Sequence, residues 1–161
     1  MKDNFNFVEK KLSDIKDNEF LKDEVALDDF ETDLGKSLRS TDSPLRWPVN
    51  PSLGITAYFH DSAYKKSMGV PHNAIDIPVI QGTKVHAAQT GVVHKVVNND
   101  DAKYNYVILA HRDGFLTLYG HLSDISVKEN DTIFAGQTIG LSGGIPGTRG
   151  AGWLTTGAHL H

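Results

Sequence analysis

Residues 104–121 read YNYVILAHRDGFLTLYGH, and this stretch predicts a β-hairpin. Two runs rich in β-branched and aromatic residues, 104–111 and 115–121, flank the dipeptide Asp113-Gly114. Asp-Gly is the pair that tight hairpin turns favour, because it tolerates positive backbone angles. The hairpin would place His121 at a strand end, where a catalytic side chain is well presented. His111, beside the turn, is expected to be exposed.

Short runs with strand character lie on both sides of this hairpin. They are expected at 55–59, 74–77, 85–88, 91–98, 132–134 and 138–141, whereas 60–70 is expected to be a polar loop and 122–128 a connection. Strict alternation along 91–98 would place Val92, His94 and Val96 on one face. Short, closely spaced strands with turn residues between them are typical of antiparallel β domains. We therefore predict a mainly β fold, an antiparallel sheet with a groove across it.

Composition limits the possible functions. The chain has 161 residues, 39% of them hydrophobic, which suits one β-rich domain with an extension. It has no cysteine, which excludes a disulfide framework and a thiolate metal site. A net charge of −4 leaves no basic footprint for nucleic acid. No segment approaches the roughly 18 apolar residues of a membrane span, and the start lacks the apolar core of a secretory signal.

The chain divides into three parts: an arm (1–43), a proline-broken linker (44–53) and a domain (54–161). The arm holds seven Lys or Arg and twelve Asp or Glu, a balance of −5, so the remainder is near +1. Its apolar residues recur at steps of three and four, which predicts one or two amphipathic helices. Such helices could pack on the domain, pair with a second copy or cover the groove as an inhibitory segment. A disordered leader is the remaining alternative.

Histidines and one aspartate at short spacings are the candidates for chemistry. In a strand, side chains at i and i+2 point to one face, so His159 and His161 project together, opposite Leu160. His72 and Asp76 lie four apart and share a face in a strand or a helix. Catalytic zinc takes three N or O ligands and keeps one position for water, a count that two His and one Asp would fit. The remaining histidines would be free for proton transfer.

Several phrases of the sequence, taken together, resemble one family. They are HNAID (72–76), YGHL (119–122), GQTIG (136–140) and TGAHLH (156–161). From about residue 47 to residue 161, the chain is similar to the lysostaphin/LytM-type zinc metallopeptidases. Members of that family cut peptide cross-bridges of bacterial peptidoglycan.

The resemblance implies a role for each matched position. His72, Asp76 and His161 resemble the ligands of one Zn²⁺. His159 resembles the general base, and His121 the residue that steadies the oxyanion or shares the proton work. The family also implies a peptidoglycan peptide as substrate and a place outside the bacterial cytoplasm, in the periplasm, in the cell wall or secreted.

Three further residues are candidate contacts to substrate or to the oxyanion. Tyr64 lies in the segment that borders the groove in the family. The other interpretation is that Tyr64 is an ordinary surface tyrosine. Arg149 and Trp153 belong to a glycine-rich run, 142–153, that walls the groove in the family. The alternative for this run is a mobile surface loop.

The sequence departs from the family pattern at two positions. Ala74 stands where glycine is usual, and because alanine does not take a positive φ cheaply, ordinary β backbone is expected there. The sequence ends at His161, whereas family members usually continue this strand. A frayed end with a terminal carboxylate is therefore expected at this ligand, where it could crowd or join the metal.

Two other functions remain open. The first is a non-catalytic LytM-like domain that binds peptidoglycan or regulates another cell-wall hydrolase, although such members typically lose ligands and all three are present here. The second is a carrier domain, since 91–93 and 131–137 resemble a biotinyl or lipoyl β fold. However, no lysine lies in the Met-Lys-Met setting that such a domain needs.

Overall fold

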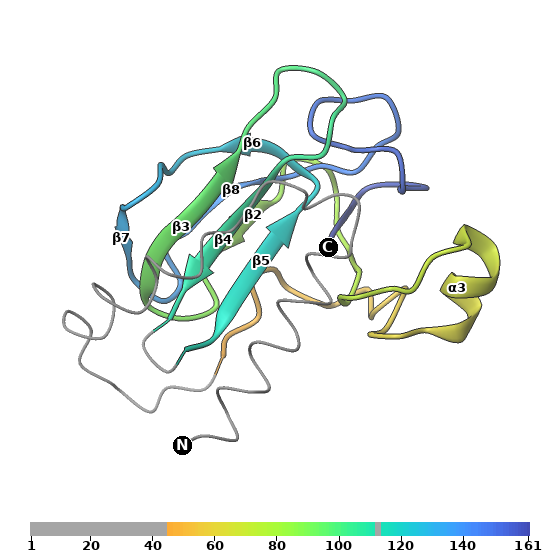
Figure 1. Ribbon diagram of the computed structural model, residues 1–161, viewed down its shortest axis with the longest axis horizontal. Helices are drawn as coiled ribbons and strands as arrows, with labels where there is room; N and C mark the ends of the chain where they lie inside the picture. The colour runs from red at the N-terminus through yellow and green to blue at the C-terminus, as the bar shows by residue number, and fades with distance from the viewer. Residues whose placement is uncertain (1–44, 112–113) are drawn as a thin grey trace.

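The computed structural model describes residues 45–111 and 114–161. Within these residues the strands form three antiparallel sheets (Figure 1). The largest has the order β5-β4-β3-β7 and contains the predicted hairpin, β4 (Tyr106–Ala110) and β5 (Leu116–Gly120). Tyr106 pairs with Gly120 and Ala110 with Leu116, so His121 follows the last paired residue of β5. The hairpin prediction is confirmed, while residues 112–113 of its turn lie outside the described part.

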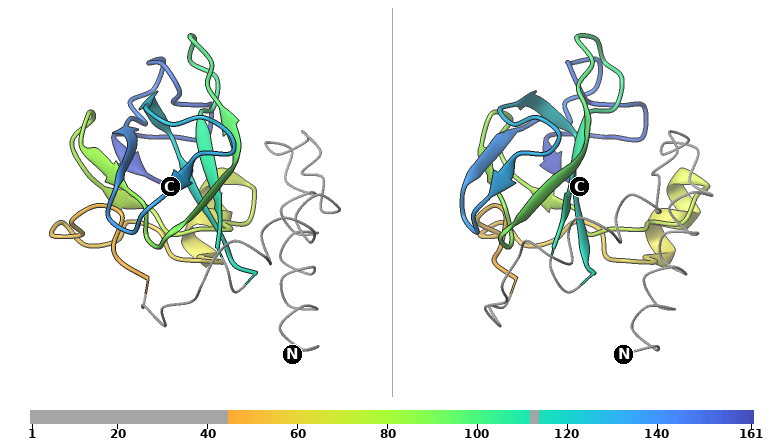
Figure 2. Two further views of the ribbon diagram at one scale, coloured as in Figure 1. Left: turned by 90° about the vertical axis from the view of Figure 1, so that its left-hand side faces the viewer. Right: turned by 60° about the vertical axis from the view of Figure 1, so that its left-hand side comes forward.

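A second sheet covers one face of the first. It consists of β2 (Lys84–His86), β8 (Thr138–Ser142) and β6 (Leu122–Ile125), with β8 in the middle. The two sheets pack against each other as in a sandwich (Figure 2). The core lies between them, and apolar side chains from both belong to one buried cluster: Val85, Ile139 and Leu122 from one sheet, Val93, Val107, Leu109, Tyr119 and Ile133 from the other. The predicted mainly β, antiparallel fold is confirmed.

The remaining strands complete the first sheet and form a third. β3 (Gly91–Val97) pairs with β4 and with β7 (Thr132–Ile133). β1 (Ile77–Pro78) pairs with β9 (His159–Leu160) in a two-stranded sheet. Ile77 and Leu160 are both 2% exposed and belong to the main core, so this small sheet is anchored to the rest.

A helix replaces the polar loop that we expected over 60–70. This helix, α3 (Ser62–Met68), stands to one side of the sheets and buries none of its residues (Figure 1). Asp61 caps its start, because the carboxylate accepts hydrogen bonds from the main-chain N–H groups of Ala63 and Tyr64. Gly69, with φ +78°, ends it in the left-handed conformation. A short helix fixed by its caps has no apolar periodicity, which is why the pattern did not reveal it.

Other local expectations were also wrong. The segment 55–59 makes only an isolated bridge, between Ala57 and Asp76, and not a strand. The expected connection after His121 contains β6. In β3 the register shifts around His94, so strict alternation fails: Val93 lies in the core and Val96 packs against the same cluster.

His111 is buried rather than exposed. Its relative exposure is 0%, and its Nδ1 lies 3.0 Å from the carbonyl oxygen of Thr90. Its Nε2 lies 2.7 Å from the hydroxyl of Thr117, which donates in turn to the hydroxyl of Tyr119. Both ring nitrogens have partners, so the imidazole can be buried without an unsatisfied polar atom.

The arm, residues 1–43, lies outside the described residues, and its helices, self-association and groove occlusion remain predictions. Part of the linker packs on the domain: Val49 is 3% exposed and belongs to the core. Among the described helices, none has the length and apolar character needed to cross a membrane.

Candidate metal centre

The β1–β9 pair brings together two segments from opposite ends of the domain. Ile77 pairs with Leu160 and Pro78 with His159, and this register places Asp76 opposite His161. Because side chains alternate along a strand, Ile77 and Leu160 turn toward the core while Asp76, His159 and His161 share the other face. The i and i+2 prediction for the two histidines therefore holds, and pairing with β1 adds the aspartate.

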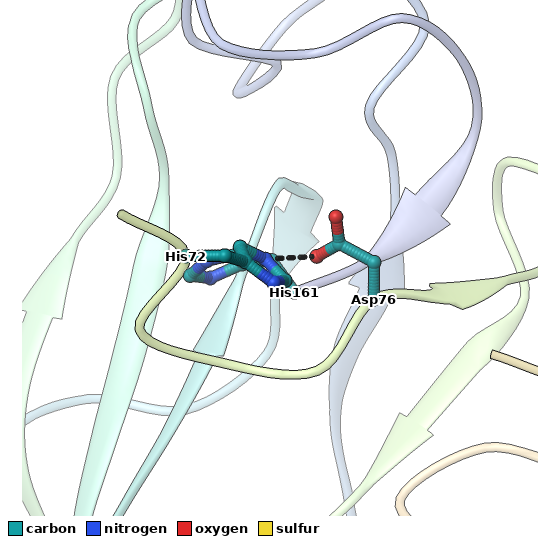
Figure 3. Close-up of side chains that lie close together, drawn as sticks. All are labelled: His72, Asp76 and His161. Atoms are coloured by element: carbon teal, nitrogen blue, oxygen red, sulfur yellow. Dashed lines mark hydrogen bonds and ion pairs between the residues drawn. The ribbon is translucent and has the colours of Figure 1, made fainter. Parts of the chain in front are cut away.

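His72, Asp76 and His161 converge at this face (Figure 3). One potential ligand atom from each lies within 4.8 Å of the other two, short enough that small rotations would bring all three onto one cation. Nε2 of His72 lies 3.1 Å from Oδ1 of Asp76. The first two residues are buried, and His161 is partly buried. Two imidazoles and one carboxylate form a donor set that suits a divalent transition metal.

The protonation of His72 provides a test of this fit. Its Nδ1 lies 2.9 Å from the main-chain carbonyl oxygen of Tyr58. A carbonyl oxygen only accepts, so Nδ1 carries the hydrogen and, in the neutral ring, Nε2 presents a lone pair toward Asp76. A lone pair and a carboxylate at 3.1 Å require a proton or a cation between them. The residues present therefore fit a bound metal ion.

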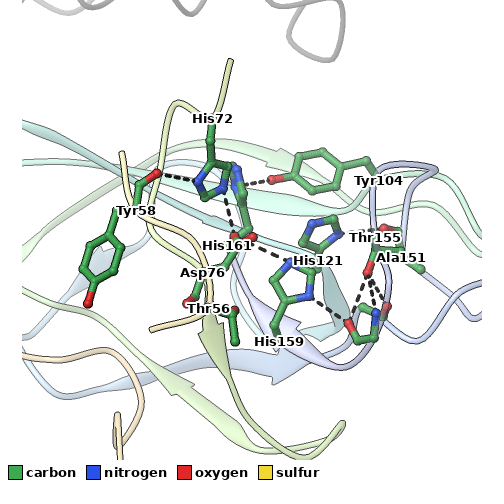
Figure 4. Close-up of polar contacts among 12 residues, drawn as sticks. Thr56, Tyr58, His72, Asp76, Tyr104, His121, Ala151, Thr155, His159 and His161 are labelled. Atoms are coloured by element: carbon green, nitrogen blue, oxygen red, sulfur yellow. Dashed lines mark hydrogen bonds and ion pairs between the residues drawn. The ribbon is translucent and has the colours of Figure 1, made fainter. Parts of the chain in front are cut away.

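His121 and His159 border this cluster (Figure 4), and in each of them, as in His72, Nδ1 faces a main-chain carbonyl oxygen. Nδ1 of His159 donates to the carbonyl oxygen of Gly157 at 2.8 Å, and Nδ1 of His121 donates to that of Ala151 at 2.6 Å. Each neutral ring is thus left with an acceptor at Nε2. The Nε2 of His159 lies 3.6 Å from Oδ1 of Asp76. The ring centroids of His121 and His159 lie 4.4 Å apart.

Burial and neighbouring groups shift the pKa values of three residues in the site. Burial would raise the pKa of Asp76, but the hydrogen bond with His72 and the nearby His159 and His161 outweigh it and lower that pKa. Burial, reinforced by the neighbouring His159 and His161, lowers the pKa of His121 to about 3. Burial likewise lowers the pKa of His161 to about 4. His121 and His161 are therefore neutral near pH 7 and keep lone pairs for a metal or a proton.

The backbone at His121 is unusual. It has φ +56°, a left-handed conformation that non-glycine residues seldom adopt. This turn joins β5 to β6 and directs the ring into the site instead of continuing the alternation of β5. Backbone conformations of this kind occur preferentially at functional sites. Ala74 has no positive φ, as expected from the alanine in place of glycine.

A groove of about 190 Å³ runs beside Asp76 and His159. Its lining also includes Tyr64 and Met68 of α3 and residues 154–158. Tyr64 also stacks on His72, with ring centroids 4.3 Å apart, so this predicted contact lies at the site.

Arg149 and Trp153 do not belong to the residues that line this groove in the described part of the chain. The Arg149 guanidinium donates to the carbonyl oxygen of Asn99 at 3.1 Å and to that of Ser123 at 2.8 Å, and it pairs with Asp124. The side chain thus holds the glycine-rich run against the sheet. Trp153 is 68% exposed.

Tyr104 is a site residue that sequence reasoning did not identify. Its hydroxyl oxygen lies 3.0 Å from Nδ1 of His161. The hairpin register could have revealed it. Because Tyr106 pairs with Gly120, residue 104 lies beyond the end of the paired strands, on the side of His121.

The end of the sequence is held in place rather than frayed. Leu160 pairs with Ile77, and the main-chain oxygen of His161 accepts a hydrogen bond from the N–H of Gly120 at 2.7 Å. This contact ties His161 to the end of β5, beside His121.

Comparisons with known proteins agree with this geometry. The profile of "Peptidase family M23" matches residues 70–161. Peptidoglycan DD-endopeptidase ShyA of Vibrio cholerae is 40% identical over 118 residues, 72% of this chain and 26% of that protein. The crystal structure of a zinc-containing peptidase from Vibrio cholerae has a TM-score of 0.60 and 32% identity, over 74% of this chain and 36% of that one.

A further relative is not named as a peptidase. Stage II sporulation protein Q of Bacillus subtilis is 31% identical over 127 residues, which is 71% of this chain and 44% of that protein. The chain spans about a quarter of the length of the curated DD-endopeptidase that it matches.

Proposed function

Since the chain belongs to peptidase family M23, we propose that it is a zinc-dependent endopeptidase that hydrolyses peptide bonds in bacterial peptidoglycan. The convergence of His72, Asp76 and His161, with two more imidazoles beside them, carries this proposal. It is the set of groups that metal-assisted hydrolysis of an amide requires. The relationship to a peptidoglycan DD-endopeptidase supports the substrate class.

His72, Asp76 and His161 would hold the ion. When bound, zinc supplies a Lewis acid that polarises the scissile carbonyl and makes water more acidic. The carboxylate reduces the net charge of the site. The carbonyl of Tyr58 fixes the ring of His72, as outer hydrogen bonds commonly do for histidine ligands.

We assign the proton transfer to His159. Its Nδ1–H is committed to Gly157, so Nε2 is the atom that accepts a proton from the attacking water. The protonated ring then returns that proton to the leaving amine. Its ring lines the groove, and its Nε2 lies 3.6 Å from Oδ1 of Asp76, so both transfers would need no large movement.

To His121 we assign the stabilisation of charge on the reacting carbonyl oxygen or a share of the proton transfer. Its Nδ1–H is held by Ala151, and its Nε2 is the atom available to the site. A donor at Nε2 requires the ring to be protonated, which burial opposes. The ring would therefore acquire a proton only as negative charge develops on the substrate.

The substrate would lie in the groove between α3 and residues 154–158. Tyr64 is a candidate contact there, since its ring lies over His72 at the groove wall. Arg149 and Trp153 remain predicted contacts for parts of the peptide beyond this groove. Because peptidoglycan lies outside the bacterial cytoplasm, a protein that cleaves it would act there too.

The test is direct. Purified full-length protein should contain one zinc per chain by elemental analysis, and it should release new amino termini from peptidoglycan, identified by mass spectrometry. Asp76→Ala should lose both zinc and cleavage, whereas His94→Ala, which removes an imidazole from β3, should keep both. Cleavage that persists after complete metal removal would contradict the proposal.

A second candidate function is a non-catalytic domain that binds peptidoglycan or regulates another hydrolase. The similarity to a protein named for sporulation, not peptidase activity, favours it. In that case the protein would bind zinc and pull down with peptidoglycan, yet release no new amino termini.

A further inference from the structure

The four imidazoles of the site are not held in the same way. Main-chain carbonyl oxygens hold the Nδ1 atoms of His72, His121 and His159 at 2.6–2.9 Å. Nδ1 of His161 instead lies 3.0 Å from a side-chain hydroxyl, that of Tyr104 (Figure 4). Among these rings, His161 therefore depends on a side chain for the orientation of its plane.

The structure leaves space for Tyr104 at this position. A Cβ on Gly120 would overlap the Tyr104 hydroxyl, and a Cβ on Gly152 would lie 3.2 Å from its Cβ and Cδ2. The tyrosine ring also meets the ring of His121 edge-on, with centroids 4.8 Å apart. The phenol is thus confined between two glycines and two histidines, which limits the rotation of each ring.

We propose that Tyr104 is a positioning residue of the metal centre, whose hydroxyl fixes the ring plane of His161. The proposal rests on the zinc site proposed above. Without the hydroxyl, His161 would sample orientations that do not point at the metal, and binding would have to restrict it again. Residues that orient metal-bound histidines typically contribute about 10–100-fold to metal affinity.

The experiment compares full-length wild-type protein, Tyr104→Phe and Tyr106→Phe. Tyr106 is the matched control, because it is a buried tyrosine whose ring centroid lies 5.6 Å from that of Tyr104, in the apolar cluster against which Tyr104 also packs. Zinc affinity is measured by competition with a chromophoric chelator. The visible spectrum of the cobalt(II)-substituted protein reports ligand geometry.

Tyr104→Phe should weaken zinc binding by about 10–100-fold and change the cobalt spectrum, whereas Tyr106→Phe should change neither. A second variant, Gly120→Ala, displaces the hydroxyl while keeping the tyrosine. In the wild-type background it should reproduce the loss of zinc affinity seen with Tyr104→Phe.

The outcomes separate the two proposals. If wild type and both tyrosine variants bind zinc equally with the same cobalt spectrum, the positioning role is wrong and the zinc site stands. If both tyrosine variants lose affinity equally, the effect is structural and the positioning role is also wrong. If wild type binds no zinc, both proposals fail.

Discussion

Acidification should destabilise the metal-free protein, and His121 should account for about 2 kcal/mol of the loss between about pH 7.5 and about pH 5. Burial and its histidine neighbours lower the pKa of this ring from 6.5 to about 3 in the folded state. In the unfolded chain the ring titrates near its ordinary value. The unfolded state therefore binds a proton that the folded state excludes, so stability falls as the pH drops below about 6.5.

The variant His121→Asn isolates this contribution. Asparagine tolerates the positive φ of 56°, and its amide can donate to the carbonyl of Ala151. Urea unfolding with chelator at both pH values should give wild type a pH-dependent loss about 2 kcal/mol larger than that of the variant. His60→Asn is the matched control, because His60 is exposed and has the same φ. Equal pH dependence in wild type and His121→Asn would refute the conclusion that burial keeps this ring neutral.

Three other predictions follow from the site. His159→Ala should keep zinc by elemental analysis but lose about 10²–10⁴-fold in turnover, because the proton acceptor is gone; loss of zinc would make it a ligand. Leu160→Ala should cost about 2–5 kcal/mol in urea unfolding, since the side chain is 2% exposed, and should weaken zinc binding by loosening the β1–β9 pair. Gly144→Ala should lower turnover with zinc retained: φ is +93° and the new Cβ would lie 3.0 Å from Nδ1 of His159. If Gly144→Ala keeps wild-type turnover, the added Cβ does not displace the ring of His159, and this prediction is wrong.

The sequence was a good guide wherever a periodic pattern coincided with burial. The hairpin of β4 and β5 followed from apolar runs around Asp-Gly, and its register then fixed the place of His121. Patterns failed where caps or bulges decide the backbone, as at α3 and around His94. The burial of His111 was missed because it depends on two specific partners that the strand pattern does not reveal, the carbonyl oxygen of Thr90 and the hydroxyl of Thr117.

By itself, the sequence determined the residue types of the site and the strand spacing that turns His159 and His161 to one side. Only the tertiary structure decided that Asp76 lies opposite His161, because this depends on the register between strands from opposite ends of the domain. It also decided which nitrogen of each ring faces the site, through carbonyl oxygens that no side-chain pattern encodes. The role of Tyr104 was also decided by the tertiary structure, since only folding brings its hydroxyl to His161. Local spacing fixes the direction of a side chain, whereas its partners are fixed by contacts between distant segments.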